Sequence, residues 1–226
     1  STLSFGDIIK ANLASDAIVS GVKALGSAVK KVGSALIDVG KSAIESYADY
    51  EQLVGGVETL FKNSASVVEN YANNAYKTAG LSANEYMETV TSFSASLLQS
   101  LGNDTKKAAE VADMAVTDMA DNANKMGTDM ASIQNAYQGF AKANYTMLDN
   151  LKLGYGGTKE EMARLLADAE KISGIEYDIS SLNDIYQAIH VIQGEMGITG
   201  TTAKEASSTI QGSVSAMKSA WQNMLT

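Results

Sequence analysis

The single histidine of the chain, His190, is the residue type best suited to catalysis or metal binding. An imidazole works as a general base or as a metal ligand, and a metal site on one helix needs a second ligand one turn away. Gly194 occupies that position, and the sequence lacks the G-x-S-x-G turn that presents a nucleophilic serine. The pattern therefore favours a packed or surface imidazole over a metal ligand or a member of a catalytic triad.

Two further patterns match functional motifs only in part. Gly40-Lys41-Ser42 ends like a nucleotide-binding P-loop, but Ala35 stands where the first glycine belongs, and the segment is expected to be helical. The acidic pairs Glu160-Glu161 and Asp168-Glu170 suit a helix start and a solvated helix face. The sequence thus predicts no catalytic residue, no metal ligand and no cofactor, and we do not expect an enzyme. Because cysteine is absent, disulfides and thiolate metal sites are excluded.

The elements that carry these residues are predicted to be helices throughout, because the 226 residues include no proline. At average usage, a chain of this length contains roughly 11 prolines. The net charge of −9 arises entirely in residues 51–226, which hold 12 basic and 21 acidic side chains. Such an acidic surface predicts no sequence-specific binding to nucleic acid. No apolar run is long enough for an ordinary transmembrane helix, and no signal peptide is visible.

Residues 1–50 are predicted to form one long amphipathic helix with a coiled-coil-like seam. Apolar side chains repeat every seven residues, and a glycine follows each residue of one row. Glycines at constant spacing weaken an isolated helix, so they indicate close approach of a partner helix and hence self-association in several copies. The predicted helix-association face comprises Val22, Leu25, Gly26, Val29, Val32, Gly33, Leu36, Val39 and Gly40.

The same segment admits a membrane-active interpretation. Phe5, Ile8 and Leu13, together with Lys10 and Lys23, form an amphipathic stretch that suits a membrane surface or oligomerisation within a membrane. Packing on sister chains is the interpretation that we favour. Contact of residues 5–47 with a host membrane is the alternative that the sequence leaves open.

Residues 51–226 are predicted to fold as a bundle of shorter helices, each opened by a capping residue. A helix near Glu51–Leu60 is expected to be interrupted or to end around Gly55–Gly56, and Gly154–Gly157 gives the strongest loop signal. The predicted helix starts are Ser66 with Glu69, Ser82 with Glu85, Asp104, Thr128, Thr158 with Glu161, Ser181 with Asp184, and Thr202 with Glu205.

The 3.6-residue period of apolar side chains predicts which face of each helix is buried. Ile172 and Met196 continue two of these stripes and are also expected inside. Trp221–Thr226 still reads as helix without a cap, so we expect the bundle to be truncated and the chain to be a piece of a longer protein. The predicted bundle core comprises Tyr86, Val90, Phe93, Leu97, Ile133, Tyr137, Phe140, Leu165, Ile189, Ile210, Val214 and Trp221.

Several long strings of the sequence resemble one family. Among them are "GVETLFKNSA" at residues 56–65 and "YANNAYKTAGLSANEYMETVTSFSASLLQSLGNDT" at residues 71–105, with further strings at 46–53, 121–174 and 188–226. Together these strings resemble the tail tape measure proteins of long-tailed bacteriophages and prophages, especially those of Gram-positive hosts. The likeness covers most of residues 45–226, and residues before it match only as a helical, glycine-spaced lead-in.

The resemblance implies a structural role in the virion. Tape measure proteins are helical, occupy the lumen of the tail tube in several copies, set tail length, and leave the tail at infection to assist genome delivery. The implied partners are tail tube and tail-tip or baseplate proteins, and tail assembly chaperones in the host cytoplasm. The family brings no catalytic motif and no cofactor to these positions. The matching region is expected to be a compact helical module within a longer ruler. The alternative remains a membrane-active, channel- or toxin-like helical protein.

Overall fold

The computed structural model describes residues 47–208, which form helices, turns and loops without any strand. The prediction of an all-α fold is therefore confirmed for this part of the chain. The predicted helix-association face, from Val22 to Gly40, lies outside the described residues, and so do the predicted core residues Ile210, Val214 and Trp221. The chain divides into two units after Gln52, and the helices treated below belong to the second, apart from the first residues of the helix over 47–61.

The described part contains α-helices joined by turns and loops, together with two 3₁₀ turns. Residues 47–61 are helical, and residues 201–208 form the start of another helix. The elements between them are η2 (Lys62–Ser64), α4 (Ala65–Thr78), α5 (Ala83–Ser100), α6 (Thr105–Met126), α7 (Met130–Ala141), η3 (Leu148–Leu151), α8 (Lys159–Ser173) and α9 (Leu182–Glu195).

Capping side chains open α5, α6, α8 and α9 where the sequence predicts them. Ser82 and Glu85 form a reciprocal capping box, in which each side chain accepts a hydrogen bond from the other residue's backbone N–H. The side chains of Asp104, Thr158 and Ser181 each accept from the backbone N–H three residues further on. Local sequence therefore fixes where these helices begin.

Two predicted helix starts are misplaced by one or two residues. The Ser66–Glu69 box is wrong, because α4 already begins at Ala65, whose N–H bonds to the carbonyl of Lys62 in the preceding 3₁₀ turn. A helix that continues from such a turn needs no side-chain cap. Thr128 does not cap α7 either; Asp129 accepts from the N–H of Ser132 at 3.0 Å.

Two further local predictions are overturned by contacts from elsewhere in the fold. Thr202 is a helical residue in the structure, because the helix over 201–208 already includes Thr201. The helix of residues 47–61 runs without interruption through Gly55 and Gly56. Val57 and Phe61 in this helix are fully buried. Burying two such side chains outweighs the cost of about 1 kcal/mol that each glycine imposes on a helix.

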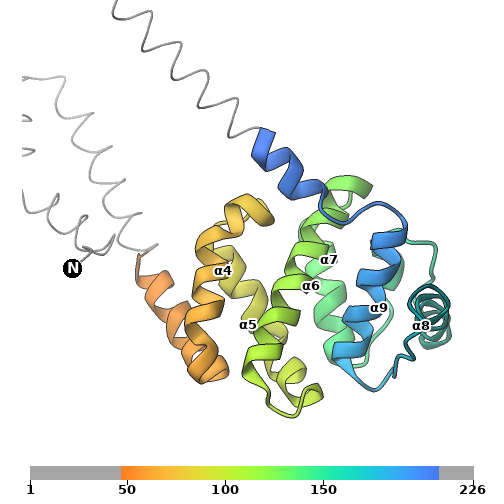
Figure 1. Cartoon of the computed structure of the whole chain (residues 1–226), viewed down its shortest axis with the longest axis horizontal. Coiled ribbons are helices and arrows are strands. Elements are labelled where there is room, and N and C mark those ends of the chain that lie inside the picture. The colour runs from red at the N-terminus through yellow and green to blue at the C-terminus, as the bar shows by residue number, and fades with distance from the viewer. Residues whose placement is uncertain (1–46, 209–226) are drawn as a thin grey trace, which may run out of the picture. The chain divides into compact units, whose positions relative to one another are not determined.

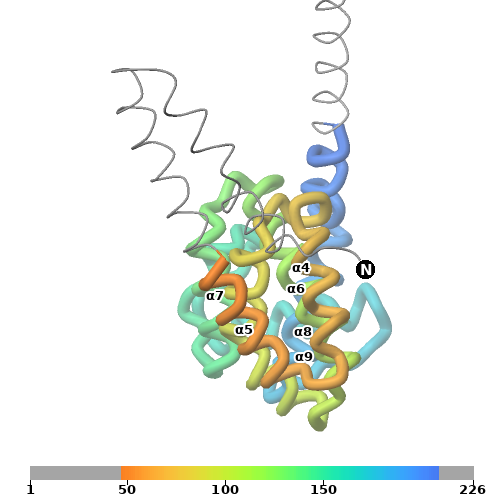
Figure 2. Tube along the Cα trace, turned by 90° about the vertical axis from the view of Figure 1, so that its left-hand side faces the viewer, coloured from red at the N-terminus to blue at the C-terminus, as the bar shows by residue number. Residues whose placement is uncertain are grey.

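Helix α6 lies at the centre of the bundle and packs against α4, α5, α7 and α9. Figures 1 and 2 show α4, α6 and α9 on one side of the bundle, with α5 and α7 on the other. Helix α8 packs on α9 and is seen end-on in Figure 1, so it crosses the other helices. This position gives α6 a buried surface on most of its circumference, which makes any polar residue in its middle significant.

The core of the bundle follows the apolar stripes of the sequence. Ile172 and Met196 are exceptions, with 46% and 44% of their surface exposed, because both lie at the C-terminal ends of their helices, where the stripe continues past the packed face. The predicted core residues that the structure describes are all buried: Tyr86, Val90, Phe93, Leu97, Ile133, Tyr137, Phe140, Leu165 and Ile189.

An aromatic cluster joins α5, α7 and α9 within this core. The Tyr186 ring lies edge-on to Phe93 at 5.4 Å between centroids and tilted against Tyr137 at 5.1 Å. Tyr137 also contacts Phe140 at 5.8 Å. Pairs of this kind add about 0.5–1.5 kcal/mol beyond the burial of their area. The cluster fixes α5, α7 and α9 against one another.

Candidate functional site

A cluster of buried polar side chains stands where α6 meets α9. Asp118, Asp121 and Asn122 of α6 and Gln193 of α9 are each at most 1% exposed. A buried carboxylate or amide is costly unless its hydrogen bonds are made, so partners must be present. We call these four residues, with His190, the buried polar cluster.

Asp118 pairs with the single histidine of the chain. The Nδ1 atom of His190 lies 3.0 and 2.9 Å from the two carboxylate oxygens. The Asp118 side chain is 2% exposed, whereas that of His190 is 39% exposed. The imidazole therefore reaches from the surface inward to a carboxylate that has no access to solvent.

The two partners have raised pKa values for different reasons. The hydrogen bond to Asp118 raises the pKa of His190, and this attraction outweighs the effect of partial burial. Burial raises the pKa of Asp118, although its hydrogen bond with His190 acts in the opposite direction. The difference follows from exposure, because the deeper group loses more hydration on folding. Both groups thus hold a proton more tightly in the folded chain.

Amide side chains complete the centre of the cluster. Asn122 Nδ2 donates to the carbonyl of Leu151 and to Gln193 Oε1, each at 2.9 Å. Thr128 Oγ1 donates to Asn122 Oδ1, and Gln193 Nε2 donates to the backbone carbonyl of Asp118. Each side-chain amide group therefore has partners, and the bonds fix the register of α9 and of the 3₁₀ turn η3 against α6.

Asp121 holds the start of the helix over residues 201–208. Its two carboxylate oxygens accept hydrogen bonds from the backbone N–H groups of Gly200 at 2.8 Å and Thr202 at 2.9 Å. A carboxylate at this place compensates the unpaired N–H groups and the positive end of the helix dipole. Asp121 thus acts as a helix cap supplied by a different helix.

The contacts of this cluster fasten helices together. In hydrolases, a carboxylate on one ring nitrogen of histidine leaves the other nitrogen free to activate a nucleophile. The hydrogen bonds of His190 within residues 47–208 go to Asp118 alone. Among these residues, no group of three or more His, Cys, Asp or Glu side chains is placed to hold a metal ion. The contacts comprise an ion pair between His190 and Asp118 and a helix cap that Asp121 provides.

A second ordered feature is the glycine-rich loop before α8, held by Arg164, the only arginine of the sequence. Arg164 Nη2 donates to the carbonyl of Gly154 at 2.8 Å, and the guanidinium lies 4.2 Å from the centre of the Tyr155 ring. Tyr155 in turn donates to Asp168 at 2.6 Å. The loop predicted at 154–157 is therefore present, and it is anchored to α8 rather than free.

Gly157 closes this loop against the backbone. A Cβ atom at Gly157 would lie 2.2 Å from the carbonyl oxygen of Thr146, a distance that no side chain tolerates. Gly154, with φ of +91°, adopts a conformation open mainly to glycine. The predicted loop signal thus has two separate physical causes, close approach at one glycine and backbone conformation at the other.

The buried polar cluster is the feature that the sequence interpretation missed. His190 was expected to be a packed or surface imidazole, and neither its pairing with Asp118 nor the burial of the acidic residues of α6 was predicted. A signal was present, because Val111, Ala115, Asp118 and Asn122 follow one another at the spacing of a single helical stripe. Polar residues on a stripe that is otherwise apolar indicate a buried network.

Comparison of the chain with protein-family models, curated proteins and solved structures finds no match.

Proposed function

We propose that the chain is part of a bacteriophage tail tape measure protein. The observation that carries the proposal is the resemblance of long strings, which extend over most of residues 45–226, to that family. The all-helical character of residues 47–208 is compatible with it. The protein would reside in the tail lumen in several copies, help to set tail length, and leave at infection to assist genome delivery.

The bundle itself contributes little length to a ruler. A helix rises 1.5 Å per residue, so α6, with 22 residues, spans about 33 Å. The helices between residues 53 and 208 fold back against one another instead of running end to end. In this proposal the length information lies in rod-like segments, of which residues 1–50 are one candidate. The bundle is a module carried by the ruler.

The charge of the bundle suits a lumen through which DNA passes. Residues 51–226 hold 12 basic and 21 acidic side chains, so the phosphate backbone is repelled rather than retained. The partners in this proposal are the tail tube, the tail tip or baseplate, and the assembly chaperones that cover the protein in the host cytoplasm. Specific recognition of nucleic acid is not part of it.

A duplication tests the ruler. At 1.5 Å per residue, duplicating residues 15–42 within the full-length protein lengthens the phage tail by about 42 Å if this stretch forms part of the rod. The matched control inserts the same number of glycine and serine residues at the exposed Gly102 turn, which leaves tail length unchanged. Electron microscopy measures both. Intact tails of unchanged length in the duplication would refute a ruler role for this stretch.

The presence of the protein in tails tests the broader proposal. Mass spectrometry of purified tails, before and after genome ejection triggered in vitro, should find the chain in the first sample and a depleted amount in the second. Tails that lack the chain altogether would overturn the assignment. As for the membrane-active alternative, no helix within residues 47–208 is long and apolar enough to cross a bilayer.

A further inference from the structure

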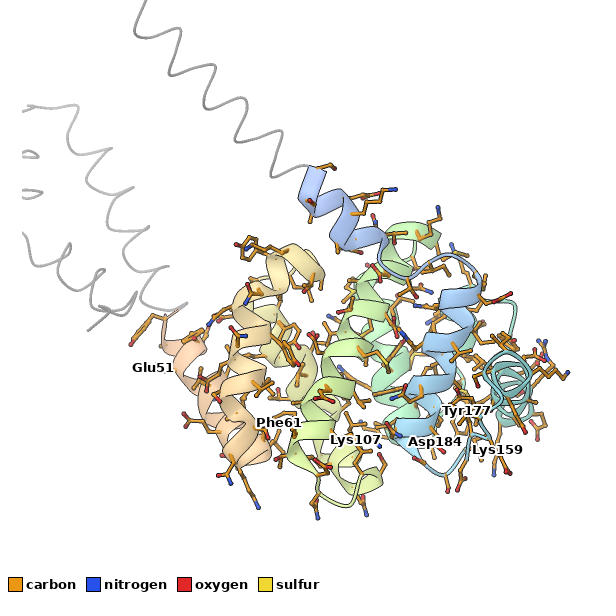
Figure 3. All side chains as sticks on the ribbon, in the orientation of Figure 1. Glu51, Phe61, Lys107, Lys159, Tyr177 and Asp184 are labelled. Carbon is orange, nitrogen blue, oxygen red and sulfur yellow. The ribbon has the colours of Figure 1, made fainter. Side chains whose placement is uncertain are left out.

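The helix over residues 201–208 is joined to the bundle mainly at its first turn. Thr201, Thr202 and Ala203 are partly buried, whereas Lys204, Glu205, Ser207 and Ser208 are exposed. Figure 3 shows this helix extending from the body of the bundle, with side chains projecting into solvent. The contacts of its first turn therefore decide the direction in which it leaves.

Those contacts are few and of identifiable kinds. Asp121 accepts from the N–H groups of Gly200 and Thr202, and a Cβ on Gly80 would lie 3.7 Å from the methyl group of Thr202. Thr202 Oγ1 is buried without a hydrogen-bond partner in the described part of the chain. The packing is thus modest, and one buried hydroxyl remains unsatisfied.

The residues just before the helix form an anchor followed by a pivot. Ile198 is 1% exposed, and its N–H bonds to the carbonyl of Gln193 at 2.9 Å, which ties it to α9. Gly197 and Gly200 have φ values of +70° and +85°, so each lies in the left-handed region. Thr201 Oγ1 also donates to the carbonyl of Ile198 at 2.8 Å. Rotation about Thr199 and Gly200 moves the helix and breaks this bond, while Ile198 stays in place.

We propose that Asp121 is a clasp that fixes the direction of this helix, and that Gly200 is the hinge about which the helix swings when the clasp opens. Opening exposes the Asp121 carboxylate, the Gly200 and Thr202 N–H groups and the Thr202 hydroxyl to water, so no charge is left buried without a partner. The lost hydrogen bonds are exchanged for bonds to water at small net cost.

The hydrogen bonds at the centre of the buried polar cluster do not depend on this motion. The pair between Asp118 and His190 and the amide bonds of Asn122 and Gln193 involve no residue after Gln193. The clasp therefore separates a firm body from a segment whose direction has two states. This inference does not depend on the proposed function, because it concerns only how one helix is joined to the body.

Spin labels measure the direction of the helix directly. The sequence has no cysteine, so Asn73→Cys on α4 and Glu205→Cys provide the only labelling sites, and both positions are exposed. In the otherwise unchanged chain, pulsed electron paramagnetic resonance should give one narrow distribution of distances between the two labels. Asp121→Ala should broaden it. The control, Asp129→Ala, removes a cap of the same chemistry from α7 and should leave it narrow.

Hydrogen exchange distinguishes a hinge from unfolding. In Asp121→Ala, amides of residues 200–208 should exchange about tenfold faster, while those of α9 keep their rates. Gly200→Ala provides a second route, since alanine is strained at a φ of +85° and should open the clasp with Asp121 intact. Unchanged distances and rates in both variants overturn the proposal. Acceleration in α9 equal to that in residues 200–208 also overturns it, because the helix and the body would then open as one unit.

Discussion

His190 and Asp118 form a contact between a half-exposed imidazole and a fully buried carboxylate, 2.9 Å apart and 72 residues apart in the chain. The pair joins α9 to α6 in the middle of the bundle. Because both groups have raised pKa values, the strength of this connection depends on pH.

The first prediction is that the bundle loses stability as the pH rises above 6.5, the ordinary pKa of histidine. The folded pKa of His190 lies above its ordinary value of 6.5. The stabilisation by the protonated imidazole is therefore complete below pH 6.5 and is lost as the pH rises through the folded pKa. Asp118, whose pKa is also raised, acts in the same direction but at lower pH. Since His190 is more than one third exposed, solvent screening limits the change to about 1 kcal/mol or less.

Urea denaturation followed by circular dichroism measures this change. His190→Gln should remove the dependence above pH 6.5, and its stability should differ least from that of the unchanged chain at the highest pH measured. A stability that rises with pH over this interval, or a dependence that survives in the variant, would contradict the assignment.

The second prediction concerns Asn122, whose amide satisfies three partners. Replacing it by leucine leaves the Leu151 carbonyl, Gln193 Oε1 and Thr128 Oγ1 without their bonds, so Asn122→Leu should cost about 2–4 kcal/mol. Asn124→Leu on the same helix is the control, because Asn124 is exposed and should tolerate the change within about 0.5 kcal/mol. Equal costs for the two substitutions would show that the network contributes nothing specific.

The apolar face and several helix starts could be predicted because their causes are local. Tyr86, Val90, Phe93 and Leu97 repeat with the helical period, and Ser82 with Glu85 is a capping pair within one turn. The Ser66 start could not be predicted in this way, because the turn before Ala65 supplies the hydrogen bond that a cap would otherwise provide.

The partners within the buried polar cluster could not be derived from local pattern, because they come from distant parts of the chain. Asn122 bonds to Gln193, and Asp121 to Gly200, across more than 70 residues. The stripe through Val111 and Ala115 indicates that Asp118 faces inward. Nothing near Asp118 in the sequence identifies His190 as its hydrogen-bond partner. Only the packing of α9 on α6 supplies that information.

The third prediction contrasts two glycines. Gly157→Ala places a Cβ 2.2 Å from a backbone carbonyl oxygen, so it should cost more than about 3 kcal/mol or prevent folding. Gly55→Ala, in a helix with nothing within 4 Å of the new methyl group, should stabilise by about 0.5–1 kcal/mol. Midpoints of thermal and urea unfolding give both values. A neutral Gly157→Ala would mean that the loop relaxes away from Thr146.

The fourth prediction separates the two functional hypotheses. If residues 5–47 serve the ruler, a peptide of that sequence should gain no helicity with anionic vesicles and should release no trapped dye. Circular dichroism and a leakage assay make the measurement, with a scrambled peptide of equal composition as the control. Leakage specific to the native order would favour the membrane-active alternative.

The carboxylates of α6 also constrain when the protein can fold during its synthesis. Asp118 cannot pair until His190, 72 residues downstream, has been synthesised. The backbone amides that bind Asp121 belong to Gly200 and Thr202, 79 and 81 residues downstream. At a translation rate of about 5–20 residues per second, that interval lasts about 4–16 seconds. Until His190 has been synthesised, a nascent chain must leave Asp118 hydrated or protonated, so α6 is fully buried only after residue 190 has emerged from the ribosome.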